Sequence, residues 1–113
     1  EANKLMDDLR NKLEEKAYRI SKLYYRMEDY QAAITSYENL LDAYPDTDYQ
    51  EEILYYITKS YYEYAEKSIY KKKAERYEKT VESYNNLIYL YPESEYIKGL
   101  TDINEDALKY LKN

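Results

Sequence analysis

The side chains of this sequence that could take part in chemistry are carboxylates, lysines and tyrosines. Its 113 residues include 23 Asp plus Glu, 17 Lys plus Arg and 19 Tyr, but no His and no Cys. Without imidazoles or thiols the chain lacks Ser-His and Cys-His catalysis and the usual zinc ligands. Its single glycine cannot build a phosphate-binding loop. We therefore expect no enzyme, no metal and no cofactor.

Acidic pairs are the remaining candidates for catalysis or calcium binding. The pairs at 14–15 and 51–52 could act as two carboxylates in acid–base catalysis. Asp46 and Asp48, close to the second pair, could bind calcium, but the spacing and the glycine of a calcium loop are missing. Acidic residues are common at helix starts and on solvent-exposed helix faces, and we expect these roles here.

Charge and hydropathy exclude two further classes. The net charge of −6 argues against nucleic acid, whose phosphates require a basic face. The longest apolar runs, Ile53–Ile57 and Leu87–Tyr91, are far shorter than the roughly 20 residues of a membrane span. The sequence begins with Glu and shows no signal peptide, so we expect a processed or excised part of a longer protein.

The elements that must position these side chains are helices. Few Gly and Pro with many Glu, Lys, Leu and Ala favour an all-α domain. Pro45 and Pro92 should end helices, and Asp29, Thr47 and Ser94 should cap the following ones. We expect tyrosines at the rims and in grooves, with aliphatic side chains behind them. Apolar spacing predicts helices at about 1–27, 30–44, 48–70, 75–91 and 95–112.

The chain also repeats itself. The motif Tyr-Pro-[Asp/Glu]-[Thr/Ser]-[Asp/Glu]-Tyr at 44–49 returns 47 residues later, and the segment 14–25 returns 37 residues later. The second copy must therefore contain about ten extra residues near 66–76. We expect one domain over 1–113, with repeat one at about 14–47, repeat two at about 51–94 and a capping helix at about 95–112.

Paired helices of this length resemble tetratricopeptide (TPR) repeats, which have a period of about 34 residues. Ala17, Ile20, Ser21, Tyr24 and Pro45 stand where that family has its Trp, Leu, Gly, Tyr and closing Pro. The Trp and the glycines of the TPR pattern are replaced. The fold implied is a TPR-like α-solenoid fragment of about five antiparallel helices, made of two helix pairs and the capping helix.

The runs NLLDAYPDTDYQEEI and NLIYLYPESEYIKGL, after LRNKLEEKAYRISKLYYRMEDYQAAI, resemble the C-terminal half of the BamD family. This version is rich in Tyr. The resemblance implies a lipoprotein of the bacterial outer membrane that faces the periplasm within the β-barrel assembly machinery. It also implies docking on the POTRA domains of BamA, with membrane association only through a lipidated N-terminus absent here. The alternative is a generic periplasmic TPR adaptor that binds an extended peptide.

Partner binding in TPR arrays usually uses a groove lined by the first helix of each pair. The repeat register predicts a ladder of phenols and charges there that suits an extended peptide. Alternatively, the tyrosines pack on the neighbouring second helix and the charges form solvated pairs. The residues concerned are Glu15, Tyr18, Lys22, Tyr25 and Arg26, followed by Glu52, Tyr55, Lys59, Tyr62 and Glu63.

Two further surfaces are candidates for contacts. Lys71, Lys72 and Lys73 could meet an acidic protein surface or anionic lipid, or they could be a solvated insertion at a helix C-terminus. The stripe formed by Leu5, Leu9 and Leu13 has nothing earlier in this sequence to cover it. We expect the stripe to pack on a preceding repeat of the parent protein, and to allow non-native self-association in isolation.

Overall fold

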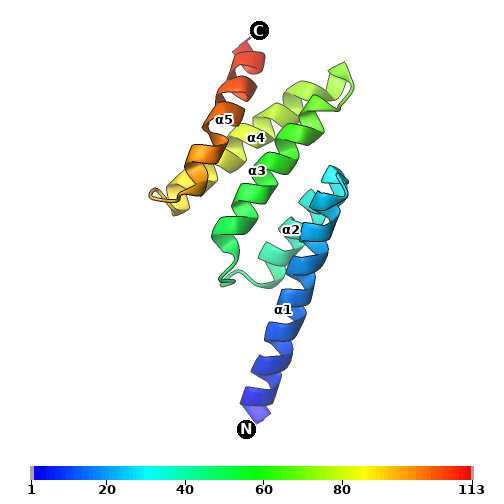
Figure 1. The fold of residues 1–113 in the computed structure, drawn as a ribbon, viewed down its shortest axis with the longest axis vertical. Coiled ribbons are helices and arrows are strands. Elements are labelled where there is room, and N and C mark those ends of the chain that lie inside the picture. The colour runs from blue at the N-terminus through cyan, green and yellow to red at the C-terminus, as the bar shows by residue number, and fades with distance from the viewer. Residues whose placement is uncertain (1, 113) are drawn as a thin grey trace.

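The computed structural model describes residues 2–112, which form five α-helices and no strand. Successive helices run antiparallel to one another in an elongated array with extents of 59 × 30 × 19 Å (Figure 1). This confirms the predicted all-α class and its five helices; Glu1, placed in the predicted first helix, lies outside the described residues. The helices are α1 (Ala2–Arg26), α2 (Tyr30–Ala43), α3 (Gln50–Glu66), α4 (Tyr70–Leu90) and α5 (Tyr96–Lys112).

The predicted stop and cap residues act at the helix ends. Asp29 accepts the backbone N–H three residues ahead at 3.2 Å, in the first turn of α2. The hydroxyl groups of Thr47 and Ser94 accept the backbone N–H two residues ahead, at 3.2 and 3.1 Å, just before α3 and α5 begin. Pro45 and Pro92 follow the C-caps of α2 and α4.

The connection between α3 and α4 corrects the prediction. The helix expected to reach residue 70 ends at Glu66, and the next begins at Tyr70 rather than near 75. Lys71, Lys72 and Lys73 therefore lie in the first turn of α4, not at a helix C-terminus, and their charge opposes the dipole of that helix. Lys73 offsets part of this, since its Nζ donates to the backbone oxygen of Glu66 at 3.0 Å.

The core contains tyrosines as well as aliphatic residues, which corrects the expectation that phenols stay at the rims. Tyr37 and Tyr77 are 0% and 3% exposed, beside fully buried aliphatic side chains such as Ile53 and Leu87. The hydroxyl of Tyr77 donates to Glu66. The hydroxyl of Tyr37 finds no hydrogen-bond partner among residues 2–112. A phenol can thus be buried in this core even where its hydroxyl has no polar partner among the described residues.

Both helix pairs are joined by the same contact. Ser21 of α1 and Ser36 of α2 share a hydroxyl–hydroxyl hydrogen bond of 2.6 Å. Thr58 of α3 and Ser83 of α4 share one of 2.8 Å, at positions 37 and 47 residues further along. A small hydroxyl residue at the crossing lets the helices approach closely and satisfies the polar group in the core. The repeat in the sequence therefore corresponds to a repeated packing contact.

Candidate partner-binding face

The residues predicted to line a groove lie on α1 and α3, and their surroundings continue onto α5. We call this surface the inner-helix face. It is made by the first helix of each pair together with α5, which run side by side in Figure 1. The predicted residues on it are Glu15, Tyr18, Lys22, Tyr25 and Arg26 of α1, with Glu52, Tyr55, Lys59, Tyr62 and Glu63 of α3.

Glu52 is the centre of the first group on this face. It accepts a hydrogen bond from the hydroxyl of Tyr18, and its other oxygen lies 3.7 Å from Nζ of Lys22. Burial, and then the bond to the Glu52 carboxylate, raise the pKa of Tyr18 above its ordinary value. Tyr18 is only 8% exposed and stacks on Tyr49. The structure thus gives Tyr18 the packing role that was the alternative to a contact residue.

Lys59 is the centre of the second group. Its Nζ lies 5.3 Å from the ring centroid of Tyr55 and 5.9 Å from that of Tyr25, and donates to the Tyr55 hydroxyl at 3.3 Å. The side chain is half-buried. The described part of the chain places no carboxylate within ion-pair distance of this ammonium. The ammonium of Lys59 is therefore positioned by two tyrosine side chains and has no counter-ion among the described residues.

Tyr62 joins the face to α5. Its hydroxyl donates to Oδ2 of Asp106 at 2.5 Å, and its ring centroid lies 6.0 Å from that of Tyr77. Burial, and then the bond to Asp106, raise the pKa of Tyr62. The contact fixes the angle between the second helix pair and the last helix, so the phenol acts within the fold as well as on its surface.

Three predicted residues stand apart from these groups. Glu15 pairs with Arg19 one turn along α1, and Glu63 pairs with Lys67 at 3.2 Å. Arg26 is exposed in the last turn of α1. Exposed pairs of this kind contribute little to stability. The structure does not bring these side chains together with Glu52 or Lys59.

Sequence reasoning missed Tyr56, which connects the phenols of this face to the core. Its ring centroid lies 4.9 Å from that of Tyr25 and 5.8 Å from that of Tyr37, and the Nζ of Lys22 lies 5.7 Å from it. The equivalent position in the first repeat is Arg19, so the repeat register gave no signal there. The density of tyrosine in α3 was the only available hint.

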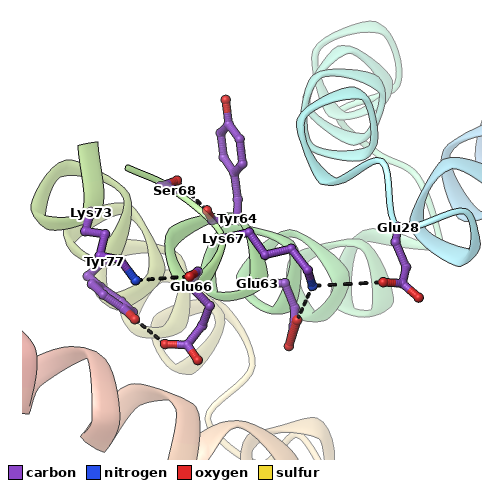
Figure 2. A network of polar contacts seen from close by, with 8 residues as sticks. All are labelled: Glu28, Glu63, Tyr64, Glu66, Lys67, Ser68, Lys73 and Tyr77. Atoms are coloured by element: carbon purple, nitrogen blue, oxygen red, sulfur yellow. Dashed lines mark hydrogen bonds and ion pairs between the residues drawn. The ribbon is translucent and has the colours of Figure 1, made fainter. Parts of the chain in front are cut away.

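The three predicted lysines beside the α3–α4 turn have different surroundings, and Figure 2 shows those of Lys73. Lys73 reaches back to the last residue of α3, and the nearby Lys67 bridges Glu63 and Glu28 at 3.2 and 3.9 Å. Lys71 and Lys72 are exposed and have no ion pair or side-chain hydrogen bond within residues 2–112. Only these two remain available to a partner.

An uncovered apolar face runs along α1. The predicted stripe is solvent-exposed, with Leu5 at 71%, Leu9 at 59% and Leu13 at 51%, and the N-terminal part of α1 projects past the other helices (Figure 1). Further along, Ile20 and Leu23 are 41% and 53% exposed. The apolar face therefore spans most of the helix.

A cavity of about 770 Å³ lies between α1 and α2, where Ile20 and Thr35 line it. Its counterpart between α3 and α4 is smaller, about 520 Å³, and Leu41 of α2 forms part of its wall. Several lining residues of the two cavities are related by the same offsets of 37 and 47 residues, such as Ile20 with Ile57 and Ser36 with Ser83. The α1–α2 cavity is thus equivalent to the surface of α3 and α4 that Leu41 of α2 partly covers.

Two further searches of the described residues complete the site. Within residues 2–112 no three acidic side chains gather as metal ligands would. None of the helices over the same range combines the length and apolarity needed to cross a bilayer.

Comparison with known families decides the affiliation of the chain. The family model YfiO, described as an outer membrane lipoprotein, matches residues 1–77. The chain belongs to the YfiO family of outer membrane lipoproteins. The match includes α1, α2, α3 and the start of α4, and so every residue predicted to contact a partner. Comparison with individually curated proteins gives no match. The BamD-like assignment is confirmed at the level of the family, and it associates the chain with the outer membrane.

Proposed function

We propose that the chain is a non-catalytic docking module of a BamD-like lipoprotein in the β-barrel assembly machinery. It acts on the periplasmic side of the outer membrane, and its inner-helix face binds the POTRA domains of BamA. The family match and the helix-pair architecture support the assignment to a scaffold of this class. We propose, in addition, that the helix pairs are TPR-like repeats.

The observation that carries the proposal is the state of Lys59. A half-buried ammonium held over the rings of Tyr25 and Tyr55 has lost part of its hydration and has no carboxylate within ion-pair distance in the described chain. An acidic side chain of a partner could supply the missing counter-ion without any rearrangement of Lys59. Contacts to preorganised, partly desolvated groups contribute most of the affinity of an interface. Lys22, by contrast, is already paired with Glu52.

The test is a calorimetric titration of the chain with soluble POTRA domains of BamA from the same organism. Lys59→Met keeps the length of the side chain and removes its charge. Lys79→Met is the matched control, because Lys79 is exposed on α4 and forms only a surface pair with Glu82. We expect Lys59→Met to weaken binding by about tenfold or more, as for a buried charged contact, and Lys79→Met to leave it unchanged.

Two outcomes would overturn this proposal. Absence of binding by a folded chain would reassign the function to the alternative, a periplasmic adaptor that binds an extended peptide. Equal losses in the two lysine variants would show a general effect of charge and remove the inner-helix face from the interface. Circular dichroism of both variants establishes that the helices are intact in either case.

We also propose that the α1–α2 cavity accepts the second helix of a preceding helix pair in the full-length protein. The support is internal, because α2 covers the equivalent surface of α3 and α4 with Leu41. Thr35→Trp would fill the cavity. It should lower the melting temperature of the full-length protein and leave that of this chain unchanged. An unchanged melting temperature of the full-length protein would contradict the proposal.

A further inference from the structure

The turn between α3 and α4 exposes two large apolar side chains. Ile69 is 69% exposed and Tyr70 is 84% exposed, and they are adjacent in sequence. The turn lies at the outer end of the α3–α4 hairpin and projects past the turn between α1 and α2 (Figure 1). Two exposed apolar side chains at a convex tip have no core to join, so their exposure is not explained by the fold.

Contacts on the inner side hold the turn in place (Figure 2). The hydroxyl of Ser68 donates to the backbone oxygen of Tyr64. Arg76 donates to the same hydroxyl. The guanidinium of Arg76 also lies 3.8 Å from the ring centroid of Tyr64. Lys73 donates to the end of α3. The tip is therefore a fixed structure that presents Ile69 and Tyr70 outward.

Two of the lysines in and beside the turn contact other parts of the chain, and two are exposed to solvent. Residues 67–73 contain four lysines and no acidic residue, although the whole chain has a net charge of −6. Lys67 and Lys73 are used in contacts with α3 and the α1–α2 turn. Lys71 and Lys72 are exposed next to Ile69 and Tyr70. The tip thus combines two free positive charges with an aliphatic and an aromatic side chain.

We propose that this tip binds the surface of a phospholipid membrane containing anionic headgroups. Ile69 and Tyr70 enter the interfacial region, where aliphatic and tyrosine side chains are favoured, while Lys71 and Lys72 contact lipid phosphates. Charges more than about 10 Å away are screened at moderate salt, so the distant acidic residues of the chain do not prevent this contact. Glu75, one helical turn beyond Lys71, is the acidic residue that follows these lysines on α4.

The proposal goes beyond docking on a protein and departs from the expectation that a lipid anchor is the only membrane contact. Membership of an outer membrane lipoprotein family associates the chain with a membrane. One such contact is weak by itself, but a tether raises its effective concentration. The tip would then set the orientation of the helix array relative to the membrane.

The experiment uses tryptophan as a local reporter, because the chain contains no Trp. Tyr70→Trp places it at the tip, and Tyr89→Trp places it at an equally exposed position, 82%, on the same helix. Vesicles of phosphatidylglycerol and phosphatidylcholine in equal parts are added, with pure phosphatidylcholine vesicles as the comparison. We expect a blue shift of the emission for Tyr70→Trp with the anionic vesicles alone, and none for Tyr89→Trp.

The lysines are tested in the Tyr70→Trp background. Lys71→Gln with Lys72→Gln should weaken vesicle binding by about tenfold or more. Lys98→Gln with Lys109→Gln changes the net charge equally on α5 and should have little effect. The proposal is overturned by the absence of a shift at residue 70, by equal shifts at 70 and 89, or by equal losses in the two lysine pairs. Because the reporter is local, vesicle binding through the apolar face of α1 would not imitate the expected result.

A protein partner at the tip gives a different pattern. The Lys71 and Lys72 variant would then weaken the titration with POTRA domains, and Tyr70→Trp would show no shift with vesicles. That result would replace the membrane proposal with a second protein interface. A failed POTRA titration together with a blue shift at residue 70 would instead overturn the docking proposal and leave the membrane contact standing.

Discussion

The ring of Tyr18 on α1 lies parallel to the ring of Tyr49 before α3, with centroids 4.2 Å apart and planes 4° apart. The equivalent residues of the next repeat, Tyr55 and Tyr96, lie with centroids 4.6 Å apart. The second tyrosine of each pair closes the Tyr-Pro motif that follows a second helix. Each motif therefore supplies a ring to the first helix of the pair before it, and the motif works as a joint between successive pairs.

This joint predicts a measurable coupling. Tyr49→Leu should lower the free energy of unfolding by about 1 kcal/mol, because a stacked aromatic pair contributes about 0.5–1.5 kcal/mol beyond its buried area. In a double-mutant cycle with Tyr18→Leu, urea unfolding should give a coupling of about that size. Tyr89→Leu, at an exposed position, should change little. Additive losses at residues 18 and 49 would show that the stack is only a geometric coincidence.

The core phenol of Tyr37 predicts an unusual result. Its hydroxyl is buried without a partner in the described chain, so Tyr37→Phe removes an unsatisfied polar group. Stability should stay the same or rise by about 1 kcal/mol. Tyr18→Phe should lower it, because Glu52 then loses a donor. Thermal unfolding of the two variants decides the point, and a clear loss in Tyr37→Phe would reveal a partner for that hydroxyl.

The tyrosines also predict sensitivity to alkali. Burial raises the pKa of Tyr37, and burial with a carboxylate neighbour raises the pKa of Tyr62 and of Tyr77, above the ordinary value of about 10. Above that pH the unfolded chain releases protons that the native state retains. The stabilising contribution of these groups is complete below about pH 10 and is lost as the pH rises toward the native pKa values.

Urea titrations on both sides of that pH measure the effect. The free energy of unfolding should fall with increasing slope above about pH 10, and Tyr37→Phe should reduce the slope. A free energy that stays constant into strong alkali would show that these phenols ionise as freely in the native state as in the unfolded chain.

Gly99 predicts a stabilising substitution. It lies inside α5 with ordinary helical backbone, and an added Cβ would meet only Cε1 of Tyr55, at 3.8 Å. That is a normal van der Waals contact, so nothing in the structure requires a glycine. Gly99→Ala should raise the free energy of unfolding by about 1 kcal/mol, measured by urea titration. Loss of stability would indicate that the helix needs the flexibility of glycine here.

The fold was largely predictable because its determinants are local. Apolar spacing, Pro45 and Pro92, and the capping hydroxyls act within a few residues of where they stand. The α3–α4 turn was misplaced because its hydrogen bonds come from Lys73 and Arg76 of α4, which donate back across the turn to Glu66 and Ser68. Helix propensities describe single residues and therefore do not include such contacts.

The candidate site was only partly predictable. Repeat register placed Tyr18, Lys22 and Lys59 on a common face, because equivalent residues of a repeat occupy equivalent places. It could not distinguish Lys22, which has a carboxylate partner, from Lys59, which has none, because the difference depends on distances across helices. Tyr56 was missed because its counterpart in the first repeat is Arg19 and not a tyrosine.

The projecting part of α1 has a consequence for hydrogen exchange. Around residues 3–13 the helix is exposed on all sides, whereas its second half packs on α2 and α3. The described tertiary contacts of this segment are those of Arg10 with Asp46 and with the ring of Tyr44. A helix of about a dozen residues with so few tertiary contacts is marginal in water. Amide protons of this segment should therefore exchange through local fraying, while those beyond Ala17 require opening of the helix pair. Any molecule that covers the apolar face would be detected first as slowed exchange in this segment.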